Sequence, residues 1–233
     1  NNSNTFRQKD RIVITIPEEA KKIKRSYIRV FGYNTKTETN DLLIPLEYGN
    51  VILSSKYLNR DDKEAQTIYF ALIDRFNNGN PRNDKPIAFE QVHAKLNFHG
   101  GDILGIKQKI EDGYFNNLGI NTIWISPVVK NPDVPIVKNG RKSAGYHGYW
   151  PLKSDKIDEH FGNEDDLRAL VETAHRKGIN IILDYVANHV YKDNPIILEH
   201  PNWSTPLYLP DGSQNLGRWE DQRFTTWFED FLP

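Results

Sequence analysis

The feature that most constrains the fold is an alternation of apolar strands and amphipathic helices that begins after Thr67. Three apolar runs of strand length, Ile68–Ile73, Ile120–Ser126 and Ile179–Val186, are separated by segments with helical periodicity. Such alternation predicts a parallel α/β sheet, because each helix returns the chain to the start of a new parallel strand. The clearest helix precedes the third run, with four apolar residues at i, i+3, i+4 and i+7: Leu167, Leu170, Val171 and Ala174.

The spacing of the strands indicates long loops after each of them. The runs begin at positions 68, 120 and 179, whereas a strand–helix–strand unit needs only about 30 residues. Helices are expected at Ile103–Leu118 and after the N-cap residue Asn163, so the surplus residues follow the strands. In a (β/α)8 barrel the loops after the strands line the functional face, so we expect a large site there.

The first 60 residues have a different pattern. Short apolar stretches between Arg11 and Leu53 are separated by turn-forming residues such as Gly32, Asn34 and Gly49. They predict a few strands, too few to close a sandwich of about seven strands. We therefore expect residues 1–60 to be the C-terminal part of a small β-sandwich module, which begins upstream, together with a linker.

Composition excludes several classes of function. The 30 Lys and Arg residues balance 31 Asp and Glu residues, and no basic block is present, so nucleic acid is not an expected partner. No apolar run reaches the ~18 residues of a transmembrane helix, so no membrane span is expected. Cysteine is absent, which excludes disulfides and thiolate metal sites.

Two segments near the first strand are rich in oxygen ligands. The sequence DRFNNGNPRND covers Asp74–Asp84, and HGGD covers His99–Asp102. Amide and carboxylate oxygens in a loop are the ligands that Ca²⁺ prefers. The same residue types are also ordinary turn formers, and Asp102 is placed to cap the following helix, so the residues alone leave both interpretations open.

Two further segments carry aromatic and polar groups at strand ends. GYHGYW covers Gly145–Trp150, and its aromatic faces suit the apolar faces of sugars, although an aromatic cluster beside Pro151 more often serves packing than binding. DYVANHV covers Asp184–Val190 at the end of the third strand, where barrel enzymes place their sites. Asn188 and His189 could instead be ordinary capping groups.

These segments together resemble the α-amylase family of glycoside hydrolases, in that family's order, from about Thr67 to Pro233. IYFALIDRFNNGNPRND, HGGDILGIKQKIEDGYFNNLGINTIWISPV, GYHGYW and DYVANHV carry the resemblance. It implies that residues 67–190 are the first three βα units of a (β/α)8 TIM barrel. Residues 191–233 would begin the loop domain inserted after barrel strand 3. The implied substrate is an α-glucan such as starch.

The resemblance also implies ligands and substrate contacts. A calcium site like that of the cyclodextrin glycosyltransferases would use six residues: Asn78, Asn80, Asn83, Asp84, Asp102 and the carbonyl of Gly100. Asn188 would bind a second calcium. Tyr149 would stack under the sugar, His147 and His189 would contact it, and Asp184 would order the floor of the site. Asp74 and Arg75 match a structural pair.

The resemblance implies a retaining mechanism, which needs two carboxyl groups about 5 to 5.5 Å apart. In the family they follow strands that come later than the third, so we assign no catalytic residue to this chain. We expect the 233 residues to be inactive alone and to need the rest of the barrel from the same or a second chain. A non-catalytic α-glucan-binding protein is the alternative. A calcium-loaded glucan enzyme without cysteine or an initial methionine suits a secreted or periplasmic location.

Overall fold

The computed structural model describes residues 5–8, 11–54, 57–88, 90, 92–138, 140–204, 210–213 and 231–232. Its centre is a three-stranded parallel sheet in the order β12–β7–β6. The strands are β6 (Ile68–Ala71), β7 (Thr122–Ile125) and β12 (Asn180–Leu183). The predicted parallel strands are therefore confirmed, although each is shorter than its apolar run.

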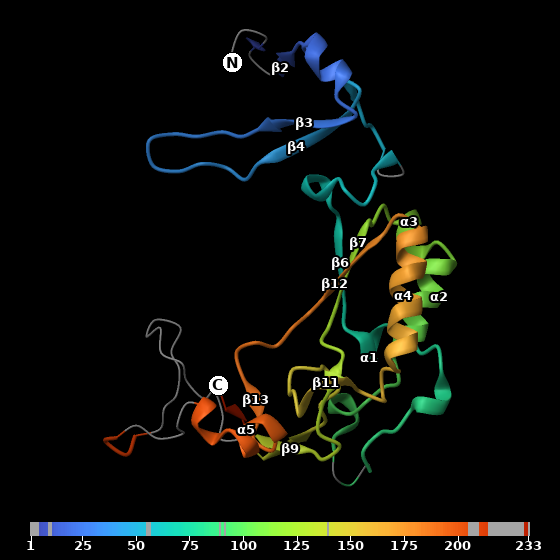
Figure 1. The fold of residues 1–233 in the computed structure, drawn as a ribbon, viewed down its shortest axis with the longest axis vertical. Helices are drawn as coiled ribbons and strands as arrows, with labels where there is room; N and C mark the ends of the chain where they lie inside the picture. Colours follow the sequence, from blue (N-terminus) through green and yellow to red (C-terminus); the bar gives the residue numbers. More distant parts are fainter. Residues whose placement is uncertain are drawn as a thin grey trace.

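The helices cover one face of this sheet (Figure 1). They are α2 (Ile103–Glu111), α3 (Tyr114–Asn117) and α4 (Glu164–Arg176). The single helix predicted over Ile103–Leu118 is wrong, because the chain breaks at Gly113, which has φ 80°. The prediction for α4 is confirmed, since Asn163 and Asp166 form a reciprocal capping box at its start.

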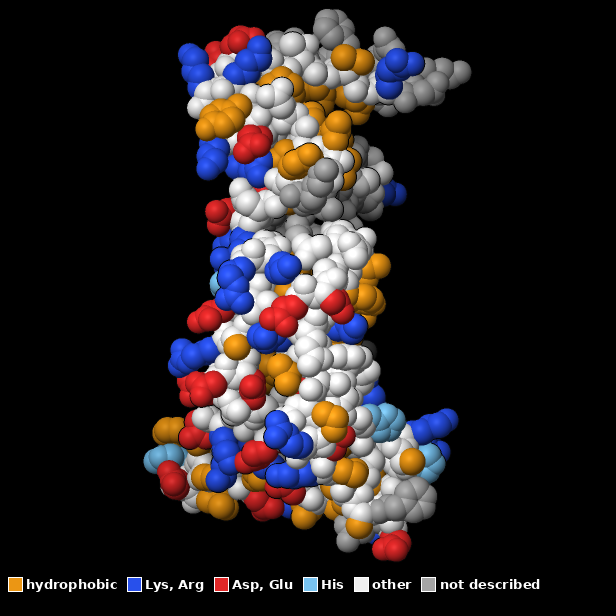
Figure 2. All heavy atoms as spheres, turned by 90° about the vertical axis from the view of Figure 1, so that its right-hand side faces the viewer, with side chains coloured by type: hydrophobic (Ala, Val, Ile, Leu, Met, Phe, Trp, Pro, Cys, Tyr) orange, Lys and Arg blue, Asp and Glu red, His pale blue; other side chains and the backbone are white. Residues whose placement is uncertain are grey.

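The two faces of the sheet differ in burial. Toward the helices, Ile123 and Ile125 pack with Ile106, Ile110 and Leu170, all fully buried. The opposite face carries one row of large side chains in register, Phe70, Trp124 and Ile182, which are 45%, 39% and 38% exposed. Figure 2, viewed from the side of α2 and α4, shows basic and acidic side chains interspersed over the outer surface.

The N-terminal residues form two small antiparallel sheets with little core of their own. One pairs β1 (Thr5–Gln8) with β2 (Arg11–Ile14), and the other joins β3 (Arg25–Val30), β4 (Leu42–Glu47) and β5 (Asn50–Val51). Leu46 is the one buried hydrophobic residue among residues 11–54. These sheets lie at the amino ends of the parallel strands, away from the loops that follow those strands (Figure 1).

Short elements fill the loops at the carboxyl ends of the parallel strands. They are α1 (Ile73–Phe76), β8 (Val129–Lys130), β9 (Ile136–Lys138), β10 (Arg141–Ser143), β11 (Lys153–Ile157), β13 (Val190–Tyr191), α5 (Pro195–Glu199) and β14 (Phe231–Leu232). Most of the segment predicted to begin a loop domain, residues 205–209 and 214–230, lies outside the described residues. No helix in the described part is long and apolar enough to cross a membrane.

Candidate functional site

The segment after α1 and the segment before α2 meet at Asp102. The Asp102 carboxylate accepts hydrogen bonds from the backbone N–H of Asn80 at 2.7 Å and of Gly79 at 3.2 Å. It also caps α2 by accepting from Gly105 N–H at 2.6 Å. Burial raises the pKa of Asp102, although these three backbone donors oppose the rise. Asp102 therefore caps the helix and joins the two oxygen-rich segments.

We call residues 78–84 and 99–102 together the cation loop. Opposite Asp102, this loop contains Asn78, Asp84 and Gly100. Asn78 Nδ2 donates to both carboxylate oxygens of Asp84, at 3.0 and 2.8 Å. Gly100 has φ +88°, and a Cβ there would lie 2.5 Å from Asp84 Oδ1 and 2.6 Å from Asn78 Nδ2. The backbone of Gly100 thus packs directly against this pair, a closeness that only glycine allows.

One oxygen of the cation loop is left without a partner. Asn83 Oδ1 is buried and accepts no hydrogen bond, which is costly unless something else satisfies it. The described residues contain no cluster of three or more His, Asp or Glu able to hold a metal. A calcium ion accepts amide and carbonyl oxygens as well as carboxylates, so two carboxylates, three amides and a carbonyl fit its chemistry.

Asp74 supports the cation loop from behind. Its buried carboxylate accepts from the backbone N–H of His99 at 2.9 Å and of Gly100 at 3.2 Å, and it pairs with Arg75. Burial raises the pKa of Asp74, while the backbone donors and Arg75 act to lower it. The Arg75 guanidinium also lies 3.8 Å from the centroid of the Tyr146 ring. This ion pair therefore connects the cation loop with the GYHGYW segment.

The second candidate region is the turn Gly145–Trp150, here called the sugar turn. His147 Nδ1 accepts the backbone N–H of Tyr149 at 3.0 Å, and Gly148 between them has φ +87°. The His147 ring packs edge-on against Trp150 at 4.5 Å between centroids. Burial, then the charges of Arg75 and His189, lower the pKa of His147 to about 4. His147 is therefore neutral near pH 7 and can both donate and accept.

The structure brings the four predicted substrate residues together. The Tyr149 hydroxyl donates to Asp184 Oδ2 at 2.6 Å, and His189 Nε2 donates to the Tyr149 carbonyl at 2.9 Å. Burial and the hydrogen bond with Asp184 raise the pKa of Tyr149. Asp184 follows β12 directly and donates its own N–H to the Ile125 carbonyl of β7 at 3.1 Å. The cluster therefore lies at the carboxyl ends of two parallel strands.

The contact that the structure shows for Asn188 is with its neighbour His189. The Asn188 side chain is exposed, and its Nδ2 lies 3.3 Å from His189 Nδ1. The structure thus places Asn188 beside His189 of the predicted substrate residues. A second calcium at Asn188 stays a prediction.

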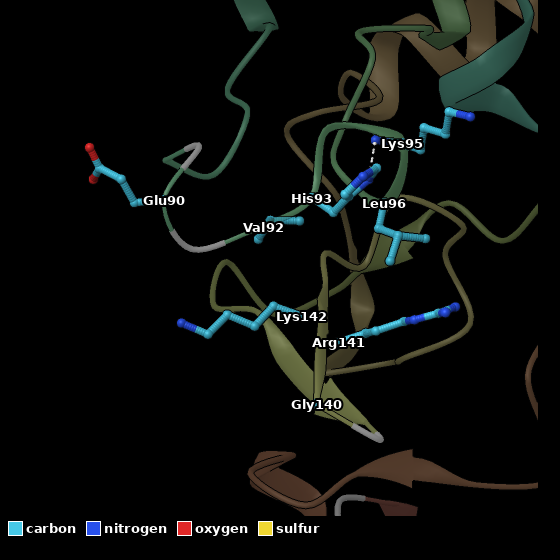
Figure 3. Close-up of a pocket in the computed structure, with 8 residues that line it drawn as sticks. All are labelled: Glu90, Val92, His93, Lys95, Leu96, Gly140, Arg141 and Lys142. Carbon is cyan, nitrogen blue, oxygen red and sulfur yellow. Dashed lines mark hydrogen bonds between the residues drawn. The ribbon is translucent and has the colours of Figure 1, made fainter.

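A hollow of about 650 Å³ lies between two loops that the motifs did not single out (Figure 3). Val92, His93 and Leu96 form one wall and the hairpin Gly140–Lys142 the other, while the charged ends of Glu90 and Lys142 extend away from the space. Residues 89, 91 and 139 beside it lie outside the described part. The hollow therefore assigns no ligand.

Sequence reasoning missed the buried polar residues behind the sugar turn. Asn131 and Asp158 are both 0% exposed and belong to none of the motifs. A buried Asn after a strand looks like an ordinary turn residue in the sequence, so no local signal marks it.

Comparison with known proteins identifies the family. Residues 70–203, more than half of the chain, match the family model for the α-amylase catalytic domain. The chain is 40% identical over 133 residues to a cyclomaltodextrin glucanotransferase of Bacillus licheniformis, which covers 56% of this chain and 18% of the relative. It is 33% identical over 165 residues to the enzyme of that name from Paenibacillus macerans, covering 70% of this chain and 23% of the relative.

Solved structures agree with the sequence comparison. An Anoxybacillus α-amylase matches at TM-score 0.54 and 35% identity, over 68% of this chain and 31% of that one. A γ-cyclodextrin glucanotransferase from alkalophilic Bacillus clarkii matches at TM-score 0.55 and 27% identity, over 72% of this chain and 26% of that one. The chain thus spans about a quarter or less of its curated relatives' length. With the motifs and the parallel sheet, these matches establish that the chain belongs to the α-amylase family and contains part of its barrel.

Proposed function

We propose that this chain is the sugar-stacking and cation-binding part of an enzyme that cleaves or transfers α-glucosidic bonds in starch-like glucans. The observation that carries the proposal is the cluster of His147, Tyr149, Asp184 and His189 at the carboxyl ends of parallel strands. That end is where (β/α)8 enzymes bind substrate.

The cluster suits a sugar ring. An aromatic ring presents a flat apolar face to the C–H face of a sugar, and the bond from its hydroxyl to Asp184 fixes the ring of Tyr149. Because its Nδ1 accepts from Tyr149, neutral His147 can donate from Nε2 to a sugar hydroxyl without requiring a charge on the ligand. The proposal therefore assigns stacking to Tyr149, hydroxyl contacts to His147 and His189, and the floor to Asp184.

The proposal includes calcium in the cation loop. Its ligands would be side-chain oxygens of Asn78, Asn80, Asn83, Asp84 and Asp102 with the Gly100 carbonyl. The Asn78 amide would turn to present its oxygen instead of the nitrogen that faces Asp84. When bound, the ion neutralises the two carboxylates and holds the loop segments together. Asn188 is the proposed ligand of a second ion.

The reaction proposed for the complete protein is the retaining double displacement, and none of its carboxyl groups is assigned to this chain. Residues 67–190 would be the first three βα units of the barrel, residues 1–60 part of a β-module, and residues 191–233 the start of a loop domain. The exposed row Phe70, Trp124 and Ile182 supports a need for further barrel strands from the same or a second chain. The 233 residues alone would be inactive, and the proposed location is secreted or periplasmic.

The test uses the complete protein that contains this chain, incubated with soluble starch. We expect new reducing ends or cyclodextrins, and a loss of about 100-fold in kcat/KM for Tyr149→Ala because the sugar is misplaced. Tyr33→Ala, at an 80% exposed tyrosine of the N-terminal sheet, is the control and should have no effect. Starch binding that Tyr149→Ala abolishes, without any product from the unmodified protein, would instead establish the binding-protein alternative.

A further inference from the structure

Three buried polar side chains lie behind the sugar turn without an assigned role. Asn131 and Asp158 are 0% exposed and His160 is 7% exposed. Buried polar groups are retained at a cost unless every donor and acceptor is paired, so a fully paired network fixes the segments that it joins. The Asp158 side chain pairs with the His160 side chain and with the backbone N–H of Asn131, and the Asn131 and His160 side chains bond to neighbouring segments.

Asn131 fixes the sugar turn at both of its ends. Asn131 Oδ1 accepts the backbone N–H of Trp150 at 2.7 Å, and Nδ2 donates to the Val129 carbonyl of β8 at 2.8 Å. A Cβ on Gly145 would lie 2.8 Å from the Cβ of Asn131, so the first residue of the turn packs on it as well. One amide therefore ties both ends of the turn to a strand.

Asp158 and His160 hold Asn131 in turn. Asp158 Oδ2 accepts the backbone N–H of Asn131 at 2.8 Å, and its Oδ1 accepts from His160 Nδ1 at 2.6 Å. His160 Nε2 donates to the Lys85 carbonyl at 3.0 Å, while the ring stacks on Phe98 at 3.8 Å between centroids. Lys85 directly follows Asp84, so the network runs from the end of the cation loop to the sugar turn.

We propose that Asn131 is a positioning residue of the sugar site, holding the backbone of Gly145–Trp150 so that His147 and Tyr149 face the sugar, with Asp158 and His160 fixing Asn131. This inference rests on the proposed function of the turn. Asn131 acts through the turn and does not touch the sugar. Its removal would take away the side-chain acceptor of the Trp150 N–H and the side-chain donor to the Val129 carbonyl, which frees the turn to move.

The test compares Asn131→Ala with Asn116→Ala in the complete protein. Asn116 is the matched control, because its exposed amide donates to the Lys177 carbonyl on the outer face at 3.3 Å. Hydrogen exchange of the peptide containing residues 145–150 should become at least about tenfold faster in Asn131→Ala and stay unchanged in Asn116→Ala. Maltoheptaose affinity, measured by isothermal titration calorimetry, should fall about tenfold in Asn131→Ala alone.

Unchanged exchange in the turn, or faster exchange with wild-type maltoheptaose affinity, would overturn the proposal. If Asn131→Ala does not fold, Asn131→Ser provides the same comparison, because its hydroxyl keeps one hydrogen bond and should give a smaller change in both measurements. If the unmodified protein binds no maltoheptaose, the proposed function fails, whereas the exchange measurement still decides whether Asn131 holds the turn.

Discussion

The cation loop and the sugar turn are both irregular segments after parallel strands, but they differ in how far their polar side chains are hydrogen-bonded. In the sugar turn, His147 and Tyr149 bond to each other, Tyr149 also bonds to Asp184, and His189 donates to the turn from outside it. In the cation loop, Asn83 Oδ1 stays buried and unpaired, and the charge of Asp84 adds to the rise in the pKa of Asp102. The polar groups of the turn named here are paired without a ligand, whereas the proposed calcium would supply the missing partner in the loop.

The largest effect expected in this comparison is that of Asp102→Ala. The substitution removes the acceptor of three backbone N–H groups and the cap of α2, so the free energy of unfolding should fall by about 3 kcal/mol. Urea denaturation of the complete protein measures it. Asp112→Ala, at the exposed C-terminal end of the same helix, is the control, and an equal loss in both variants would contradict the account.

Calcium should stabilise the protein by binding the cation loop, with Asn83 as one of its ligands. At a calcium concentration 100 times the Kd, the unmodified protein should gain about 2.7 kcal/mol relative to the chelated protein. Asn83→Ala should lose most of that gain while changing the stability of the chelated protein little, since its oxygen has no partner to lose. Thermal unfolding with calcium or EDTA measures both. A gain that persists in Asn83→Ala would remove this residue from the site.

Tyr149→Phe tests whether the turn is held by its own hydrogen bonds. Removing the hydroxyl leaves Asp184 without its 2.6 Å partner, and a hydrogen bond to a charged group contributes about 1.5 to 3 kcal/mol. Maltoheptaose affinity should fall about tenfold, with calcium binding in the cation loop unchanged. Calorimetric titration with each ligand separates the two. Weaker calcium binding in Tyr149→Phe would show that the regions are not independent.

The smallest effect concerns pH and His160. Burial acts to lower the pKa of His160, and so does Lys130, but the hydrogen bond and charge of Asp158 raise it above the ordinary value of 6.5. The other charged groups beside it are Lys85 and the two partners of Lys130, Glu159 and Asp133. Because the folded pKa is raised, the stability that protonation contributes is full below pH 6.5 and is lost as pH rises through the folded pKa.

Urea denaturation between pH 6 and pH 9 measures this loss. The unmodified protein should lose more stability over that range than His160→Gln, by at most about 1.4 kcal/mol per pH unit for one proton. Parallel stability curves for the two proteins would mean that His160 does not titrate with folding.

The sequence predicted what short-range patterns determine. The periodicity and caps of α4 specify that helix locally, and three apolar runs specify the parallel strands. The break at Gly113 was missed because the helical spacing of Ile103, Ile106 and Ile110 continues to Tyr114, four residues after Ile110. The motifs named the residues of the site but could not show their pairing.

The polar residues that hold the sugar turn could not be predicted from the sequence, because their hydrogen bonds depend on tertiary structure. Asn131 and Asp158 are 27 residues apart in the chain, and their hydrogen bond forms only when β8 and β11 pair. The orphan oxygen of Asn83 is likewise a consequence of how the loop packs, since its neighbours Asn78 and Asn80 have the same side chain and find partners.

Hydrogen exchange of both regions in one protein, with calcium and after chelation, tests the contrast between them most directly. The account predicts that chelation speeds exchange in the peptides covering residues 78–84 and 99–102 at least about tenfold, while exchange in residues 145–150 changes little. Equal acceleration in the two regions, or no acceleration in the cation loop, would contradict it.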